Sequence, residues 1–160
     1  MTSEPLVEVN TASVQNSLQH LLIVEPDPEQ AGILLNLLRR AGVDNPSCRV
    51  ATFLEAMNYL KGEGSFGSRN LYPLPSVIFL NLEPSGYLGF KLMEWIHTQP
   101  ETSECVLVIC SELSGVLDLS KCYRLGAKTF LLKPFNLAEV KNMVQHFPAF
   151  WKSTPEKRRA

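Results

Sequence analysis

The chain has 160 residues, a formal net charge of −1, 45% apolar residues and 19% charged residues. This length and composition favour one soluble globular domain with a sizeable core, and the balanced charge gives no reason to expect nucleic-acid binding. The four cysteines lack the paired spacing of a zinc site, and residues 1–19 have the pattern of neither a signal peptide nor a membrane anchor. We therefore expect a cytoplasmic protein that binds neither nucleic acid nor a membrane.

Apolar runs and turn residues divide the first half of the chain into alternating strands and helices. Residues 1–19 are polar and rich in Ser, Thr and Asn, which predicts a flexible lead-in. Asp27 is the expected N-cap of the first helix, because a capping carboxylate followed by a proline suits a helix start. The predicted elements are a strand over 21–24, a helix from Pro28 that ends at Ala41-Gly42, a strand over 46–51, a helix over 53–60 and a loop over 61–75.

The second half begins with a short apolar run over 76–81, which is bounded by Pro75 and Pro84 and ends on Asn81. A run this short suits a strand that is buried on both faces better than a helix. The last helix opens with a capping-box pattern formed by Asn136 and Glu139. The other predicted elements are a helix over 88–98, a strand over 106–110, a helix over 114–125 that ends at Gly126, a strand over 129–132 and a last helix that runs through Val144.

Five strands that alternate with five helices predict an α/β fold. Regular alternation implies right-handed crossovers and one five-stranded parallel sheet with helices on both faces, a doubly wound (βα)5 arrangement. We place this domain at residues 20–146, after the lead-in over 1–19. Residues 147–160 form a tail that is first aromatic and then basic.

Polar side chains stand where four of the predicted strands end. These are Glu25, Asn81, Ser111 and Lys133. The carboxyl ends of parallel strands share one edge of a sheet, and ligands bind at that edge in open α/β folds. We therefore expect a carboxylate, an amide, a hydroxyl and an ammonium to meet there.

Four motifs follow one another along the chain. They are Leu22-Ile23-Val24-Glu25, Ile78-Phe79-Leu80-Asn81-Leu82, Val108-Ile109-Cys110-Ser111, and Phe130-Leu131-Leu132-Lys133-Pro134-Phe135 after Gly126-Ala127. Together they resemble the receiver domain of two-component response regulators, and the resemblance covers residues 20 to about 146. It implies the flavodoxin-like receiver fold. It also implies a signalling module rather than an enzyme.

In that family, two adjacent acids after the first strand hold Mg²⁺, and an Asp at the end of the third strand accepts a phosphoryl group from a histidine kinase. A Ser or Thr after the fourth strand and a Lys after the fifth bind the phosphate. By resemblance, Ser111 and Lys133 occupy these phosphate-sensing positions, and Glu25 occupies the first acidic position. Phe130 occupies the position of an aromatic residue that rotates during signalling.

The chain departs from the family at the two positions that matter most for the chemistry. Asn81 stands where the phosphoacceptor Asp belongs, and its amide is a poor nucleophile without the charge that attracts a cation. Pro26 stands at the second acidic position, and Asp27, one residue later, is better explained as the helix N-cap. We therefore expect Mg²⁺ binding to be weak or absent, and we expect no other metal or cofactor.

Two further acids lie near the predicted site. Glu83 follows Asn81 by two residues, and Glu112 follows Ser111 directly. Either carboxylate could pair with Lys133 and imitate the charge of a phosphoryl group, or both could point into solvent. A half-buried lysine without an anionic partner would be costly, which favours some internal pairing.

The long loop over 61–75 and the closing Phe150-Trp151 resemble the stand-alone receivers that are associated with bacterial phytochromes. The resemblance implies a sensor histidine kinase or another signalling protein as partner, with a bacterial phytochrome as a candidate, and a homodimer formed through the last helix and its neighbours. Candidate interface residues are Val116, Leu117, Phe147, Phe150 and Trp151.

These observations favour an atypical stand-alone receiver that acts by protein–protein interaction without aspartyl phosphorylation. One alternative is a receiver that is competent in phosphotransfer through a displaced acid such as Glu83 or Asp27. A second alternative is a small-anion-binding module that uses Lys133 and Ser111 at the vestigial site.

Overall fold

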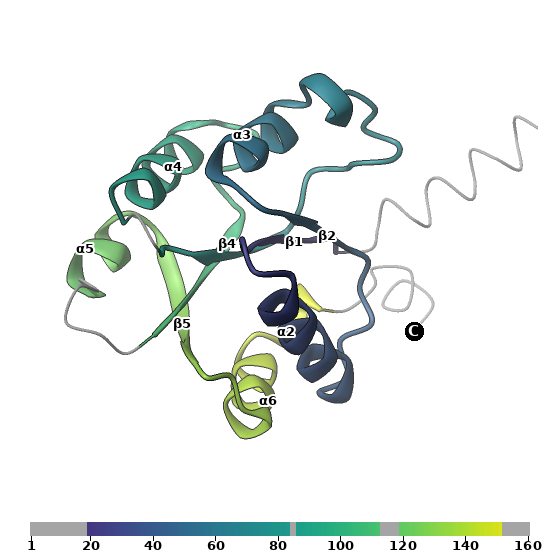
Figure 1. Ribbon diagram of the computed structural model, residues 1–160, viewed down its shortest axis with the longest axis vertical. Coiled ribbons are helices and arrows are strands. Elements are labelled where there is room, and N and C mark those ends of the chain that lie inside the picture. The colour runs from purple at the N-terminus through teal and green to yellow at the C-terminus, as the bar shows by residue number, and fades with distance from the viewer. Residues whose placement is uncertain (1–18, 84–85, 113–118, 152–160) are drawn as a thin grey trace, which may run out of the picture.

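The computed structural model describes residues 19–83, 86–112 and 119–151, in which strands and helices alternate along the chain (Figure 1). The strands are β1 (Leu21–Val24), β2 (Ser47–Val50), β3 (Val77–Asn81), β4 (Val106–Glu112) and β5 (Ala127–Lys133). The helices are α2 (Pro28–Arg40), α3 (Phe53–Lys61), α4 (Gly86–Thr98), α5 (Leu119–Arg124) and α6 (Leu137–His146), with short 3-10 turns at Gly64–Phe66 and Pro148–Phe150.

The five strands form one parallel sheet in the order β2-β1-β3-β4-β5. Strands β1, β3 and β4 are the inner strands, and their apolar residues are almost fully buried. This burial explains why their sequences read as continuous apolar runs rather than as an alternation of apolar and polar residues. The predicted α/β sheet is confirmed.

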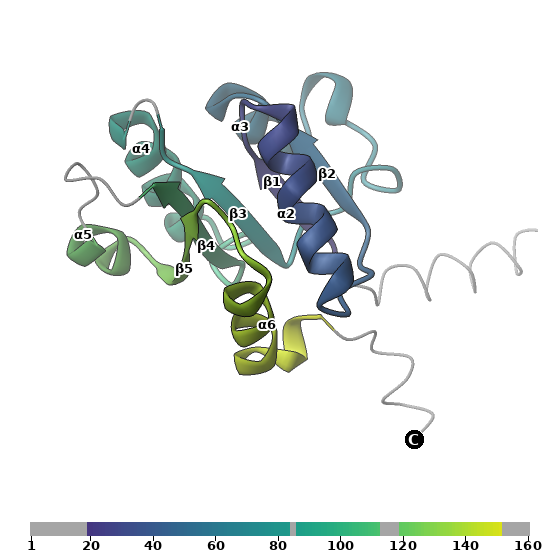
Figure 2. The same ribbon diagram turned by 60° about the horizontal axis from the view of Figure 1, so that its bottom comes forward.

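Side chains that alternate along the inner strands supply two separate cores, one on each face of the sheet. Helices α2 and α6 cover one face, and α3, α4 and α5 cover the other (Figures 1 and 2). Ile23 and Phe79 face α2 and α6, whereas Val24 and Leu80 face α3, α4 and α5. The same alternation continues past the strand ends. It therefore decides on which face each polar residue of the candidate site emerges.

Side-chain caps fix the starts of three helices. Asp27 accepts a hydrogen bond from the backbone N–H of Glu29 at 3.0 Å, and Asn136 accepts one from Glu139 at 2.8 Å. Both predicted N-caps are therefore confirmed. Thr52 caps α3 in the same way through the N–H of Glu55. Each such cap is worth about 1 kcal/mol of stability.

Several boundaries differ from the predictions. Strand β4 continues two residues beyond the predicted end, because Ser111 and Glu112 pair with β5 although neither is apolar. Strand β5 begins at Ala127, and α4 begins at Gly86. The part of the predicted helix over 114–118 lies outside the described residues, as do Val116, Leu117, the lead-in over 1–18 and the tail from residue 152. Within the residues that the structure describes, no helix is long and apolar enough to cross a membrane.

The loop after α3 is held by one arginine and a group of aromatic rings. Arg69 donates hydrogen bonds to the carbonyl oxygens of Tyr59, Leu60 and Tyr72, at 2.7 to 3.0 Å. The hydroxyl of Tyr59 donates to the carbonyl of Pro73 at 2.9 Å, and its ring lies 5.2 Å from that of Phe66. The segment predicted as a loop therefore has a defined path along α3.

Candidate functional site

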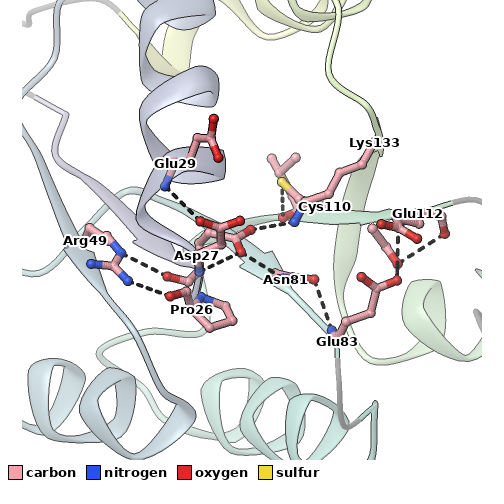
Figure 3. A network of polar contacts seen from close by, with 12 residues as sticks. Pro26, Asp27, Glu29, Arg49, Asn81, Glu83, Cys110, Glu112 and Lys133 are labelled. Carbon is pink, nitrogen blue, oxygen red and sulfur yellow. Dashed lines mark hydrogen bonds and ion pairs between the residues drawn. The ribbon is translucent and has the colours of Figure 1, made fainter.

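The predicted polar residues meet at the carboxyl edge of the sheet, where Figure 3 labels Asn81 and Lys133 among them. Glu25 directly follows β1, Asn81 ends β3, and Lys133 ends β5. Glu25 contacts both Asn81 and Lys133, while Ser111 of β4 joins them through Glu83. These side chains come together because the strands are parallel and in register. The expectation that four strand ends bring them together is therefore confirmed.

The carboxylate of Glu25 is the centre of the cluster. Its Oε1 lies 2.7 Å from the Nζ of Lys133, and both side chains are more than nine-tenths buried. Its Oε2 accepts hydrogen bonds from the Nδ2 of Asn81 at 3.2 Å and from the backbone N–H of Asp27 at 3.1 Å. A buried charge of either sign is costly when it has no partner, and here each charge compensates the other.

Asn81 uses both ends of its amide. Its Nδ2 donates to Glu25, and its Oδ1 accepts from the backbone N–H of Glu83 at 3.0 Å. A carboxylate can only accept a hydrogen bond and a backbone N–H can only donate one, so this pair of partners requires a side chain that both donates and accepts. An ionised Asp at this position would lose the bond to Glu25 and place two carboxylates against each other.

Glu83 binds the end of β4. Its Oε2 accepts from the hydroxyl of Ser111 at 3.1 Å and from the backbone N–H of Glu112 at 3.3 Å. The Ser111 hydroxyl also lies 3.3 Å from the carbonyl oxygen of Glu112. The hypothesis that Glu83 or Glu112 pairs with Lys133 is therefore wrong. Lys133 pairs with Glu25 instead, and its Nζ lies 2.7 Å from the Oε1 of Glu25.

The turn after β1 carries no second acid at the position of Pro26, and Asp27 is occupied as the cap of α2. Arg49 of β2 binds this turn from the edge of the sheet. Its Nε donates to the carbonyl of Glu25 at 2.9 Å, and its Nη2 donates to that of Pro26 at 2.8 Å. Arg49 was not among the residues predicted for the site. Its position near the end of β2, the strand beside β1, was the feature of the sequence that could have indicated it.

The donor set at the turn does not fit a divalent cation. Mg²⁺ binding requires carboxylate oxygens that are free to face the ion. In this site, one oxygen of Glu25 contacts an ammonium and the other accepts two hydrogen bonds. Within residues 19–83, 86–112 and 119–151, no group of three or more His, Cys, Asp and Glu side chains is placed to hold a metal ion.

Cys110 lies beside Asn81 in the sheet register and is fully inside the core. Burial raises the pKa of its thiol well above the ordinary range, the nearby Lys133 lowers it, and Glu25 raises it further. Burial dominates, so the thiol stays neutral. Cys110 therefore supplies no nucleophile to the site.

A second feature is a groove of about 460 Å³ between β5, α5 and α6. Phe130 lies half-buried in its wall, with its ring 5.0 Å from the ring of Tyr123 in an edge-to-face arrangement. Phe147 forms part of the same wall and stacks on Phe150 at 5.7 Å. This apolar groove is separate from the polar site.

Trp151 belongs to the core rather than to the surface. Its ring stacks on Phe79 at 6.2 Å, and 9% of the residue is exposed. Phe147 and Phe150 are half-buried and pack against the same core. The residues predicted as an aromatic tail thus close the α2 and α6 face of the domain, with Trp151 buried and the two phenylalanines still partly accessible.

The parallel sheet, the helices on both faces and the polar cluster at the carboxyl edge define a flavodoxin-like receiver fold. Residues 21–145 match the response regulator receiver domain family, and the chain belongs to this family of two-component signalling proteins. The two-component response regulator ARR7 of Arabidopsis thaliana is 31% identical over 130 residues, which cover 79% of this chain and 61% of the relative. ARR15 of the same plant is 29% identical, with 78% and 60% covered. The chain therefore spans less than two thirds of the length of these relatives.

Solved structures share the fold. The bacteriophytochrome response regulator RtBRR has a TM-score of 0.73 and 24% identity, with 84% of this chain and 81% of that chain covered. A response regulator in red light signaling of R. palustris has a TM-score of 0.68 and 22% identity, with 84% and 94% covered. The phosphorylated cyanobacterial phytochrome response regulator RcpA has a TM-score of 0.67 and 23% identity, with 86% and 96% covered.

Proposed function

We propose that this receiver signals through contacts with other proteins and is not phosphorylated at the usual position. The observation that supports this function is the double use of the Asn81 amide, which donates to Glu25 and accepts from the N–H of Glu83. A phosphoacceptor needs a carboxylate with a free oxygen that can attack phosphorus. The position holds an amide with both of its ends engaged.

The groups that normally stabilise the transferred phosphoryl group are also engaged. Lys133 contacts Glu25, and Ser111 contacts Glu83, so each of them already has a carboxylate of the chain as its partner. Weak Mg²⁺ binding belongs to the same proposal, since Pro26 supplies no carboxylate and Glu25 is paired. Without metal and ammonium to neutralise developing charge, phosphoryl transfer loses its main source of electrostatic stabilisation.

The test is incubation of the full chain with acetyl phosphate and Mg²⁺, followed by intact-mass analysis. We expect no gain of a phosphoryl group in the wild-type protein. The matched positive control is Asn81→Asp combined with Pro26→Asp, which restores both acids in the same fold. A labile phosphoryl group on the wild-type chain that disappears in Asn81→Ala would contradict the proposed function.

The same experiment covers phosphotransfer through a displaced acid. Asp27 caps α2 through its Oδ1, and Glu83 accepts two hydrogen bonds from β4 at its Oε2, so one oxygen of each carboxylate is engaged. Labelling of the wild-type chain that is abolished by Glu83→Gln would identify Glu83 as the acceptor. Labelling abolished by Asp27→Asn would identify Asp27.

For partners, we propose a sensor histidine kinase or another signalling protein, with a bacterial phytochrome as a candidate. The support for the phytochrome candidate is the likeness in fold to response regulators named for phytochromes. The groove bounded by Phe130 and Phe147 and the partly accessible Phe150 are the surfaces we propose for partner or homodimer contacts.

A further inference from the structure

We propose, on the basis of the function proposed above, that Glu83 is a tethered anion that occupies an oxyanion-binding position at the end of β4. The position consists of the Ser111 hydroxyl and the backbone N–H of Glu112, which both donate to the same oxygen of Glu83 at 3.1 and 3.3 Å. Two donors that converge on one carboxylate oxygen form a site for any oxyanion, and hydrogen bonds to a charged acceptor are the strong kind.

The surroundings explain why this contact forms. Ser111 is 3% exposed, so its hydroxyl has little access to water and requires a partner within the protein. It lies 3.1 Å from the Glu83 carboxylate and 3.3 Å from the carbonyl oxygen of Glu112, and the charged carboxylate is the stronger acceptor. The Nζ of Lys133 lies 2.7 Å from Glu25, on the face of the sheet opposite to Ser111. Lys133 is therefore not the group that binds Glu83. The hydroxyl and the amide of β4 therefore bind the Glu83 carboxylate without help from the ammonium.

The backbone that connects Glu83 to Asn81 is short and is held in one orientation by a hydrogen bond. Glu83 follows Asn81 by two residues, and the Asn81 Oδ1 accepts from the Glu83 backbone N–H at 3.0 Å. An intramolecular ligand held in this way competes at a high effective concentration, so a free anion must displace it before it binds. Glu83 is half-buried, which leaves its side chain a path to solvent when it is displaced.

The consequence concerns regulation. The end of β4 holds an anion in its hydrogen bonds without any phosphoryl donor. Ser111 and Glu112 pair in register with Leu132 and Lys133 of β5, so this arrangement is part of the sheet edge that adjoins the groove at Phe130. The receiver therefore keeps its β4 end in one constant anion-bound state, and removal of Glu83 opens the position to external oxyanions.

The test is a titration with inorganic phosphate without Mg²⁺ or a phosphoryl donor, followed through the backbone amide signals of Ser111 and Glu112 in nitrogen–proton NMR spectra. We expect Glu83→Ala to bind phosphate at least about tenfold more tightly than the wild-type chain, because the tethered competitor is gone. Adding Ser111→Ala to that variant should remove the gain. The spectra also show directly whether each variant is folded.

The matched control is Glu94→Ala, which deletes one exposed acidic side chain on α4 and leaves the Glu83 contact in place. Its phosphate affinity should stay within a factor of about two of the wild type, since distant surface charge is screened by salt. Equal affinities of wild type and Glu83→Ala, no binding by Glu83→Ala, or an equal gain in Glu94→Ala would each overturn the proposal. Because no phosphoryl group is transferred here, these outcomes are independent of the acetyl phosphate experiment.

Discussion

At the scale of single residues, the site is a series of ion-pair and hydrogen-bond contacts in which each polar side chain already has a partner within the protein. Glu25 pairs with Lys133, Asn81 joins Glu25 to the backbone of Glu83, and the Glu83 carboxylate reaches Ser111. Each contact satisfies a buried or half-buried polar group. A single substitution therefore removes one contact and also leaves a neighbouring polar group without its partner.

The Glu25 and Lys133 pair offers a direct test of this interdependence. We expect Glu25→Gln and Lys133→Met to destabilise the fold by about 3–5 kcal/mol each, because each leaves a buried charge without its partner. The double variant should lose much less than the sum, since neither charge is then present. Urea denaturation measures all three free energies of unfolding.

The control for this cycle is Glu94→Gln on the exposed side of α4, which should change stability by less than about 0.5 kcal/mol. Strictly additive losses in the double variant would contradict the view that Glu25 and Lys133 compensate each other.

At the scale of elements, the parallel strands place the site and the loops decide how rigid its surroundings are. The strand ends of β1, β3, β4 and β5 lie at one edge because the strands pair in parallel register. The loop after α3 shows how a segment without regular structure is fixed. Arg69 donates hydrogen bonds to three backbone carbonyl oxygens, which in a helix or sheet would be bound by backbone N–H groups.

Substitution of Arg69 by lysine should loosen this loop. A lysine keeps the charge but cannot place two nitrogens on carbonyls in the fixed geometry of a guanidinium. We expect Arg69→Lys to cost about 1–2 kcal/mol of stability. Hydrogen exchange in residues 62–74 should become faster, as measured by mass spectrometry. Arg124→Lys on exposed α5 is the matched control, and equal exchange in both variants would refute the role of Arg69.

Tyr59 links the same loop to the pH dependence of stability. Burial raises the pKa of its phenol from 10.0 to about 12, with smaller contributions from Cys48 and Tyr72 that raise it and from Arg69 that lowers it. The unfolded chain therefore loses this proton first, and its ionisation favours unfolding as pH rises from 10 to about 12.

We expect the stability of the wild-type chain to fall across this pH window, whereas Tyr59→Phe should show a shallower decline in urea denaturation. Tyr123→Phe, at a position that is 54% exposed, should keep the wild-type slope. A slope that Tyr59→Phe leaves unchanged would show that other groups control the alkaline loss of stability.

At the scale of the whole molecule, one sheet separates two cores, and the end of the described chain completes one of them. Trp151 packs on Phe79 beneath α2 and α6, so the aromatic segment after α6 is part of the fold. Phe147 and Phe150 remain partly accessible beside it. Any homodimer that uses this end of the molecule must therefore contact the phenylalanines, not the buried indole.

This distinction decides how the oligomeric state should be tested. Trp151→Ala should cost about 3–5 kcal/mol, because it opens a cavity beside Phe79. Phe150→Ala should cost less and leave the domain folded, since that ring is only half-buried. In sedimentation analysis, we expect the wild-type chain to dimerise and Phe150→Ala to shift toward monomer. Equal sedimentation of the two would place any dimer contact elsewhere.

The sequence determined the order of strands and helices, the N-caps at Asp27 and Asn136, and the meeting of Glu25, Asn81 and Lys133. Local signals suffice for these features, because the spacing of apolar residues, the capping residues and the strand ends can each be recognised from residues close together in the sequence. The boundary of β4 was missed, because polar Ser111 and Glu112 are held in the strand by pairing with β5.

Only the tertiary structure decided which charges pair. The sequence left open whether Glu83 or Glu112 pairs with Lys133 or points into solvent; in the structure Lys133 binds Glu25 and Glu83 binds Ser111. Arg49 and Arg69 reach carbonyl oxygens that no local pattern indicates. The physical reason is that the partner of a long side chain depends on which face of the sheet it leaves and on distances between strands, and both are set by the packed fold rather than by spacing along the chain.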